Sequence, residues 1–194
     1  MIENISRSLN QTRQTIETFI CDENNFQLIN EAINCFVKSI KSGGKIISCG
    51  NGGSMCDANH FAEELTGYYR KKRPALPAIA INDSAHISCV ANDEGFDFIF
   101  SRFIETIGNC EDTLLAISTS GNSLNVLRAC EEAKSKKMKV VGLLGKDGGK
   151  LKDKVDVPII VHGETSDRIQ EVHIKIIHII IEGIERSIYP TNYV

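Results

Sequence analysis

Five short apolar runs constrain the fold of this 194-residue chain more than any other feature of the sequence. They are KIISC (45–49), PAIAI (77–81), TLLAI (113–117), KVVGLL (139–144) and VPIIV (157–161). Runs this apolar are typical of strands buried on both faces of a sheet, and the mainly helical segments between them are typical of parallel crossovers. The sequence therefore predicts an α/β fold with three layers, in which helices flank a five-stranded, mostly parallel sheet.

The two ends of the chain are predicted to be helical. Residues 1–42 have the pattern of two helices with a break at CDENN (21–25), and residues 166–188 have the pattern of one long helix. Asp167 and Gln170 are spaced like a capping box at its start, and its isoleucines occupy more than one face. Such a helix packs between layers or between subunits, so we expect an oligomer. We expect one domain over 1–194, with 1–42 used in packing or oligomerisation.

The composition of the chain argues against some classes of binding partner. The net charge of −3 provides no basic field that would attract nucleic acid or an anionic membrane. The most apolar stretch, IKIIHIIIEGI, is too short for a bilayer span, and we see no signal peptide. The seven cysteines are scattered, mostly within apolar runs, and form no C-x-x-C pair. This pattern predicts reduced, buried thiols in a cytoplasmic protein.

A glycine loop follows the first apolar run and opens a helix. Its sequence is Gly50-Asn51-Gly52-Gly53-Ser54, and such a turn directs backbone N–H groups and a helix N-terminus toward a bound anion. The loop lacks the third glycine of the dinucleotide fingerprint and the G-K-[ST] of a Walker loop. The alternative is a turn whose glycines serve backbone geometry alone.

A hydroxyl-rich loop, STSGNS (118–123), follows the third apolar run and also precedes a helix. Several hydroxyls at a helix N-terminus can donate hydrogen bonds to a phosphate monoester, whose charge the helix dipole favours. Capping of the helix by Ser120 or Ser123 is the competing interpretation and explains one hydroxyl. In a parallel sheet both loops should face one crevice, which favours binding of a small phosphorylated molecule.

The helix after the glycine loop carries His60 and Glu64, which share one helix face, whereas Glu63 points about 100 degrees away. The pair could act in acid/base chemistry or bind a metal, although a surface ion pair uses the same spacing. Asp57, Asn92 and Asp93 could reach the same crevice or be solvated turn residues and caps.

The last helix carries Gln170, Glu171, His173 and His178. Gln170 and His178 are separated by an axial rise of about 12 Å. They could therefore contact one site only by reaching toward each other or by coming from different subunits. His178 could instead be a satisfied core residue. His86 and His162 have no recognisable partner and are interpreted as structural or surface residues.

The chain resembles the sugar isomerase (SIS) domain family, in particular its branch that isomerises sedoheptulose 7-phosphate. The motifs that carry the resemblance span nearly the whole chain: SCGNGGSMCDANHFAEELTGYY, HISCVANDEGFDFIFSR, ISTSGNSLNV, GLLGKDGGK and DRIQEVHIKIIH. The resemblance implies a cytoplasmic homotetramer that forms D-glycero-D-manno-heptose 7-phosphate, an early step toward ADP- or GDP-heptose and lipopolysaccharide.

The resemblance also implies residue roles. Glu64 and His178 match acid/base positions, and zinc would be held by His60, Glu64, Gln170 and His178. The residues implied to bind substrate are Asn51, Gly52, Gly53, Glu64, Asn92, Asp93, Ser118, Thr119, Ser120, Ser123 and Gln170.

The chemistry expected of such a site is a proton transfer between neighbouring carbons through a cis-enediol. A buried carboxylate with a raised pKa suits that transfer, and Glu64 is the candidate. His178 could move the proton between the two oxygens or take over from Glu64 on one side. A carboxylate bound to zinc is a weaker base, so we expect the metal to bind reversibly and to tune activity or stability. The alternatives are a non-catalytic sugar-phosphate sensor or replication-initiation regulator of the same fold, and an isomerase for another sugar phosphate.

Overall fold

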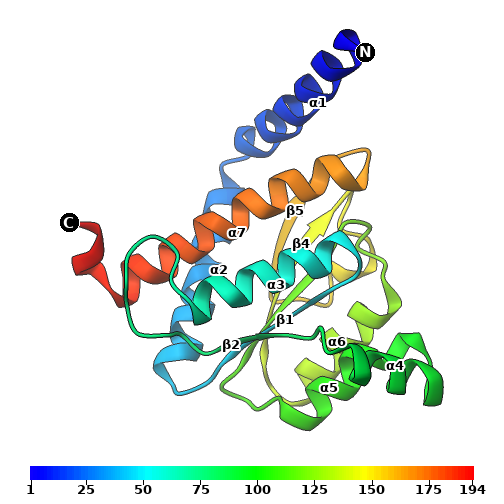
Figure 1. Cartoon of the computed structure of the whole chain (residues 1–194), viewed down its shortest axis with the longest axis vertical. Helices are drawn as coiled ribbons and strands as arrows, with labels where there is room; N and C mark the ends of the chain where they lie inside the picture. The colour runs from blue at the N-terminus through cyan, green and yellow to red at the C-terminus, as the bar shows by residue number, and fades with distance from the viewer.

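A parallel sheet forms the centre of the computed structural model, which describes residues 1–194. The strand order is β2-β1-β3-β4-β5, and every neighbouring pair is parallel (Figure 1). The strands are β1 (Ile46–Gly50), β2 (Ala78–Ala80), β3 (Thr113–Ser118), β4 (Lys139–Gly145) and β5 (Val157–Val161). Each predicted run overlaps one of them, with bounds that differ by at most one residue, so the predicted fold class is confirmed.

Seven α-helices surround the sheet. They are α1 (Ile2–Cys21), α2 (Asn24–Lys41), α3 (Gly53–Thr66), α4 (Ser84–Asp93), α5 (Ile99–Ile107), α6 (Leu124–Ser135) and α7 (Ser166–Ile188). Short 3-10 turns occupy Phe96–Phe98, Gly149–Leu151 and Pro190–Tyr193. The two leading helices and the long last helix are therefore where the sequence predicts them. No helix combines the length and the apolar character needed to cross a bilayer.

Two hydrophobic cores lie on opposite faces of the sheet. Side chains alternate between the faces along a strand, so Leu115 and Ile117 of β3 join one core while Leu114 and Ala116 join the other. The first core is closed by α2, α3 and α7, and the second by α5 and α6. Helices α3 and α7 are thus neighbours on one face, and α6 lies on the other.

Helix α1 projects from the rest of the molecule (Figure 1). Only Thr15 and Phe19 of this helix are buried, and Ile2, Ile5 and Leu9 near its start are exposed. An apolar groove farther along contains side chains from α1, α2 and α7, among them Ile16, Phe19, Ile20, Phe26 and Ile179. Apolar side chains thus remain uncovered along α1.

The predicted capping box at the start of α7 is wrong. Thr165 occupies the N-cap position, no side chain caps the helix, and Asp167 lies inside the first turn. Asp167 pairs there with the guanidinium of Arg168, while the amide of Gln170 lies against Gly53 of α3. Neither side chain therefore caps the helix, because Asp167 binds its neighbour Arg168 and Gln170 packs against another helix.

The prediction of buried cysteines is also wrong in part. All seven are unpaired, but only Cys49 and Cys130 are buried, and Cys35 is half-buried. The other four are exposed: Cys21, Cys56, Cys89 and Cys110. A surface helix has a solvent side as well as a core side, and Cys56 and Cys89 lie on the solvent side, whereas Cys21 ends α1 and Cys110 lies in a turn.

His173 is a core histidine of α7. It is fully buried, and one ring nitrogen, Nε2, lies 3.0 Å from the carbonyl oxygen of Leu144, to which it donates. Its other ring nitrogen, Nδ1, has no hydrogen-bond partner. Burial lowers the pKa of His173 from about 6.5 to about 4. The residue is therefore neutral in the folded chain.

His173 should make the fold less stable in weak acid. The unfolded chain gains a proton at this residue as the pH falls through about 6.5, but the folded chain gains it only near 4. The contribution of His173 to the free energy of unfolding is fully present above about pH 6.5 and is lost as the pH falls toward 4. We expect the free energy of unfolding to be about 2 kcal/mol lower at pH 5 than at pH 7 from this residue.

Urea unfolding at both pH values measures this effect. His173→Gln is the reference variant, because its amide retains a donor for Leu144 and does not titrate. The loss of stability between the two pH values should be smaller in the variant by about 2 kcal/mol. Equal losses in the two proteins would show that His173 is not responsible.

Candidate active site

The glycine loop and the hydroxyl loop leave the sheet side by side. Strands β1 and β3 are paired neighbours, with Gly50 opposite Ile117 in register. The loop at 50–53 and the loop at 118–123 therefore begin at the same edge, at the carboxyl ends of the strands. Helices α3 and α6 start directly after them, so two helix N-termini with unbonded N–H groups meet at this edge.

The glycine loop requires glycine at two positions. Gly52 is the N-cap residue of α3 and has φ +57° and ψ −122°, a conformation that side chains with a Cβ rarely adopt. A Cβ on Gly53 would lie 2.6 Å from the amide of Gln170. The second glycine thus allows α7 to approach the start of α3 closely, and it places Gln170 beside the loop.

The hydroxyls of the second loop bond to one another rather than to the helix. Ser118 Oγ lies 3.0 Å from Ser123 Oγ and 3.4 Å from Ser120 Oγ, while Thr119 Oγ1 donates to Ser166 at 3.1 Å. Ser123 occupies the N-cap position of α6, yet its side chain makes no cap hydrogen bond. The capping interpretation is therefore wrong for Ser123, and three serine hydroxyls form one cluster at the helix start.

A reciprocal amide pair joins the two loops. Asn51 Nδ2 donates to Asn125 Oδ1 at 2.8 Å, and Asn125 Nδ2 donates back to Asn51 Oδ1 at 2.8 Å. Asn125 is buried, and its Oδ1 also accepts the backbone N–H of Val126. Sequence reasoning missed Asn125 because it reads as an ordinary polar residue in the first turn of a helix.

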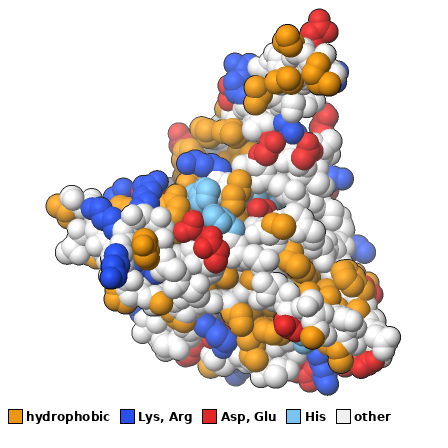
Figure 2. All heavy atoms as spheres, in the orientation of Figure 1, with side chains coloured by type: hydrophobic (Ala, Val, Ile, Leu, Met, Phe, Trp, Pro, Cys, Tyr) orange, Lys and Arg blue, Asp and Glu red, His pale blue; other side chains and the backbone are white.

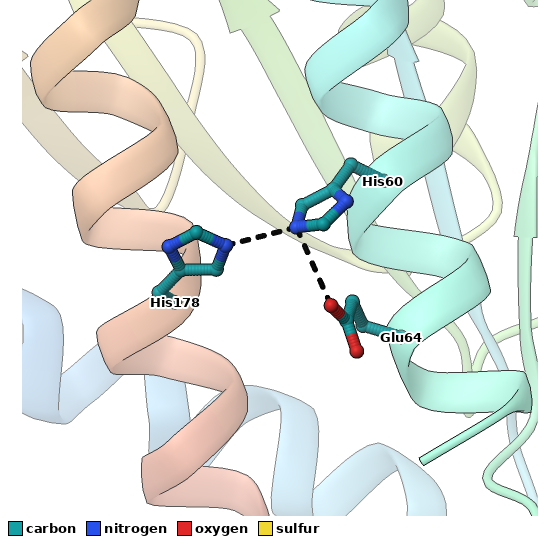
Figure 3. Close-up of side chains that lie close together, drawn as sticks. All are labelled: His60, Glu64 and His178. Atoms are coloured by element: carbon teal, nitrogen blue, oxygen red, sulfur yellow. Dashed lines mark hydrogen bonds and ion pairs between the residues drawn. The ribbon is translucent and has the colours of Figure 1, made fainter. Parts of the chain in front are cut away.

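Two histidines and a glutamate meet between α3 and α7 (Figure 3). His60 Nε2 lies 2.9 Å from His178 Nε2 and 3.6 Å from a carboxylate oxygen of Glu64. All three side chains are partly exposed, and histidine and acidic side chains lie together at the surface in Figure 2. His178 is therefore not a core residue of α7; the core histidine of this helix is His173, whose Nε2 bonds to Leu144.

Glu63 orients His60 from the other side of its ring. Its carboxylate lies 3.0 Å from His60 Nδ1, although the helical-wheel argument set this residue apart from the His60–Glu64 face. Residues three apart on a helix are close enough for long side chains to meet. A proton held on Nδ1 by Glu63 leaves a lone pair on His60 Nε2, which points at His178 and Glu64.

Burial and neighbouring charge tune the ionisation of this cluster. Burial, together with the negative charge of Glu63, raises the pKa of Glu64 above its ordinary value, and His60 acts in the opposite direction. Burial and the nearby His60 lower the pKa of His178. Asp57, one turn before His60, is buried with Oδ2 unpartnered, and burial raises its pKa to about 6. The cluster thus combines a carboxylate of raised basicity with a neutral imidazole.

The loop after α3 covers His178. The Tyr69 ring stacks on the His178 imidazole, with centroids 5.6 Å apart and planes at 23°. The loop is held by Arg73, which donates to the carbonyls of Glu64, Leu65 and Gly67 at 2.8–2.9 Å. None of these contacts was predicted, because no local spacing connects Tyr69 with His178.

A buried ion pair anchors this loop to α7. Arg73 Nε lies 2.6 Å from a carboxylate oxygen of Glu185, and side-chain exposures are 1% and 0%. The other carboxylate oxygen of Glu185 accepts from the Tyr193 hydroxyl at 2.5 Å. The guanidinium also neutralises the carbonyl end of α3. Arg73 and Glu185 therefore fix the end of the helix that carries Glu64.

The structure brings some of the predicted residues together and leaves others apart. Asn92 and Asp93 lie exposed at the end of α4, hydrogen-bonded to each other at 2.7 Å, and contact none of the cluster residues. Gln170 lies beside Gly53, about 12 Å along α7 from His178. His86 and His162 bond backbone carbonyls of Ile99 and Lys146, as expected of structural residues.

The His60–Glu64–His178 cluster fits a divalent metal. Its three donor atoms lie within 4.8 Å of one another. Two nitrogens on one tetrahedral zinc ion are separated by about 3.3 Å, so the 2.9 Å between the two Nε2 atoms requires only a small ring movement. Glu63 supplies the outer carboxylate that commonly holds the second nitrogen of a metal-bound histidine. Gln170 of the same chain is not part of this cluster.

Comparison with known proteins agrees with this geometry. Residues 9–145 match the SIS domain family model. The phosphoheptose isomerase of Edwardsiella ictaluri is 54% identical over 189 residues, which cover 96% of this chain and 98% of that protein.

Two solved structures share the fold along most of their length. A phosphoheptose isomerase from Francisella tularensis has a TM-score of 0.90 and 35% identity, covering 95% of this chain and 98% of that one. Phosphoheptose isomerase from Neisseria gonorrhoeae has a TM-score of 0.88 and 34% identity, covering 94% and 97%. The chain therefore belongs to the SIS domain family and, within it, to the phosphoheptose isomerase family.

Proposed function

We propose that this protein is a ketose–aldose isomerase that converts sedoheptulose 7-phosphate into D-glycero-D-manno-heptose 7-phosphate. The observation that carries the proposal is the Glu64–His60–His178 cluster, retained together with two anion-binding loops. The substrate is inferred from a relative at 54% identity that is named phosphoheptose isomerase. The product would enter the synthesis of nucleotide-activated heptose for lipopolysaccharide or related glycans.

The phosphate would be bound by the hydroxyl loop. Ser118, Ser120 and Ser123 already form one hydroxyl cluster at the N-terminus of α6, and each hydroxyl can turn its proton toward an anion. Backbone N–H groups at Gly52 and Gly53 and the amide of Gln170 would bind the sugar hydroxyls. Thr119, Asn92 and Asp93 are further proposed contacts.

Glu64 would act as the base. Its carboxylate removes the proton from the carbon beside the carbonyl, the electron pair forms the carbon–carbon double bond of a cis-enediol, and the same proton returns to the adjacent carbon. The raised pKa of Glu64 strengthens it for this task. Neutral His178 would move a proton between the two substrate oxygens as the carbonyl and hydroxyl exchange places.

Zinc is the metal that we propose for the cluster, held by His60, Glu64 and His178. A bound divalent ion would polarise the carbonyl and stabilise negative charge on the enediol oxygens. The proposed fourth ligand, Gln170, would have to come from another chain, because within one chain it lies about 12 Å along α7 from His178.

Metal removal is expected to change both activity and stability. Treatment with a chelator should lower turnover and the melting temperature, and added zinc should restore both, because ligand binding stabilises only the folded form. His178→Gln should respond far less to the chelator, since it lacks one ligand. Metal-free protein with unchanged turnover and melting temperature would contradict the metal assignment.

Removing two loop hydroxyls is expected to weaken substrate binding. Ser118→Ala combined with Ser120→Ala should raise KM about 10- to 100-fold with little change in kcat, because two hydrogen bonds to a charged group are lost. Ser135→Ala, a serine at the other end of α6, is the matched control and should have no effect. An unchanged KM in the double variant would place the phosphate elsewhere.

The isomerase proposal is tested directly by incubating the protein with sedoheptulose 7-phosphate and following the aldose by NMR. Conversion in the presence of zinc is the expected result. Binding without conversion would instead support a sugar-phosphate sensor or regulator, the alternative that the relatives do not favour. Conversion of a shorter sugar phosphate with higher kcat/KM would indicate a different isomerase.

The same proposal includes assembly as a homotetramer in the cytoplasm, with residues 1–194 as one domain. The uncovered apolar side chains of α1 and the groove beside it support an interface between copies. About 16 Å of helix axis separates Glu64 from Gly53 within one chain. In an oligomer, the His60–Glu64–His178 cluster of a neighbouring copy could lie closer to these two loops than the chain's own cluster. The seven unpaired thiols suit a reducing compartment. Light scattering of the purified protein measures the assembly.

A further inference from the structure

We infer that Asn125 is a positioning residue, which acts with Asn51 as a clamp between the two anion-binding loops. The inference rests on the proposed function, because it assigns these loops to the sugar phosphate. Asn125 belongs to neither the predicted binding residues nor the acid/base cluster. Its role is to fix the distance and orientation of one loop relative to the other.

The first observation is that each amide satisfies the other. Both hydrogen bonds measure 2.8 Å, so the oxygen and one N–H of each carboxamide face the partner. Asn125 Oδ1 additionally accepts the N–H of Val126 at 2.9 Å, which caps one of the free donors of α6. The Asn51 side chain is thereby committed to Asn125, and the loop presents its backbone to a ligand.

The second observation is the burial of the pair at the point where the loops separate. Asn125 is only 2% exposed, and a buried carboxamide without its partner would carry a desolvation cost. Strands β1 and β3 hold the loops in register up to Gly50 and Ile117. Beyond that point α3 and α6 follow opposite faces of the sheet, and the amide pair links the loop before α3 to the first turn of α6.

The clamp sets the separation between two groups of hydrogen-bond donors. The hydroxyl cluster of Ser118, Ser120 and Ser123 lies at one end of the clamp, and the N–H groups of Gly52 and Gly53 lie at the other. A phosphorylated sugar that contacts both groups requires a fixed separation between them, since small misplacements of binding groups are costly. Loss of the clamp should therefore weaken binding and leave proton transfer by Glu64 intact.

A double-mutant cycle tests the clamp. Asn51→Ala, Asn125→Ala and the double variant are compared for KM, kcat and the dissociation constant of inorganic phosphate, measured by calorimetry. Each single variant should raise KM and the phosphate dissociation constant about tenfold, with kcat changed less than twofold. The double variant should show the same tenfold effect rather than a hundredfold one, because the second substitution removes nothing further.

Asn25→Ala is the matched control for a purely structural effect. Asn25 is also a buried asparagine, 6% exposed, and its amide donates to the Phe19 carbonyl at 2.8 Å, away from both loops. This variant should lose stability while KM and phosphate affinity stay unchanged. Asn125→Asp should bind phosphate no better than Asn125→Ala, because a carboxylate cannot donate a hydrogen bond to Asn51.

The outcomes separate the clamp from the isomerase proposal. Multiplicative effects in the double variant, or unchanged KM and phosphate affinity in Asn125→Ala, would overturn the clamp even if the unaltered protein converts sedoheptulose 7-phosphate. Absence of phosphate binding by the unaltered protein would also overturn it, because no anion site would exist to align. Non-additive phosphate binding without conversion would retain the clamp and reject the isomerase.

Discussion

Glu64→Gln is expected to lower kcat about a thousandfold while the dissociation constant for sedoheptulose 7-phosphate changes only a few-fold. Glutamine retains the size of the side chain but cannot take a proton from carbon, and positioned general bases typically contribute factors of about 10² to 10⁴. We expect binding to be retained because the proposed phosphate contacts lie on another element, the loop at 118–123. Steady-state kinetics and calorimetry on the same preparations provide the two measurements.

Glu63→Gln is the matched control for this experiment. Glu63 neighbours Glu64 in the chain and is more exposed, with 64% side-chain exposure against 18%, and it contacts only the far nitrogen of His60. We expect less than a tenfold loss of kcat, since an amide oxygen can still accept the Nδ1 proton. Equal losses in the two variants, or near-normal turnover in Glu64→Gln, would remove Glu64 from the role of base.

The largest loss of stability is expected from Glu185→Gln. This substitution leaves the Arg73 guanidinium buried without its counter-ion, and unpaired buried charges cost about 3–5 kcal/mol. The Tyr193 hydroxyl loses its charged acceptor at the same time. Urea unfolding at pH 7 should show the decrease in the free energy of unfolding.

Two comparisons identify the cause of that decrease. Arg73→Met combined with Glu185→Leu removes both charges and should recover part of the lost stability, because the desolvation cost disappears while the carbonyls of Glu64, Leu65 and Gly67 lose their donor. Glu105→Gln breaks the exposed pair with Arg102 and should cost less than about 1 kcal/mol. A loss below that level in Glu185→Gln would show that solvent reaches the buried pair.

The sheet could be predicted because the strands are mostly apolar, a pattern typical of strands buried on both faces of a parallel sheet. The pairing of His60 with Glu64 was likewise accessible, since it depends on local helical spacing. The third member, His178, comes from a helix more than a hundred residues later, and only family resemblance connected it to the others. The partial exposure of His178 could not be predicted, because it depends on how α3 packs against α7.

Apart from the contact of Glu63 with His60, three residues away, the main contacts that escaped prediction join residues distant in sequence. Asn125 binds Asn51 across 74 positions, and Glu185 binds Arg73 across 112. Neither pairing has a spacing rule, because the register between elements is set by the whole core. The false capping box shows the converse: the spacing of Asp167 and Gln170 was suitable, but Asp167 pairs with its neighbour Arg168 and Gln170 lies against α3.

The position of β1 beside β3 in the strand order has a consequence for how such proteins can diverge. The chain turns outward to β2 after β1 and in the other direction to β4 after β3, so the crevice between their loops is a topological switch point. The SIS domain match at residues 9–145 contains both loops but ends before α7, which carries His178. The proposed anion-binding loops thus follow from the topology of the sheet and share this match with Glu64, whereas the proposed proton relay also needs His178 from a helix outside it. Mutations in α7 could convert an isomerase into a receptor for the same sugar phosphate without rebuilding the site that recognises it.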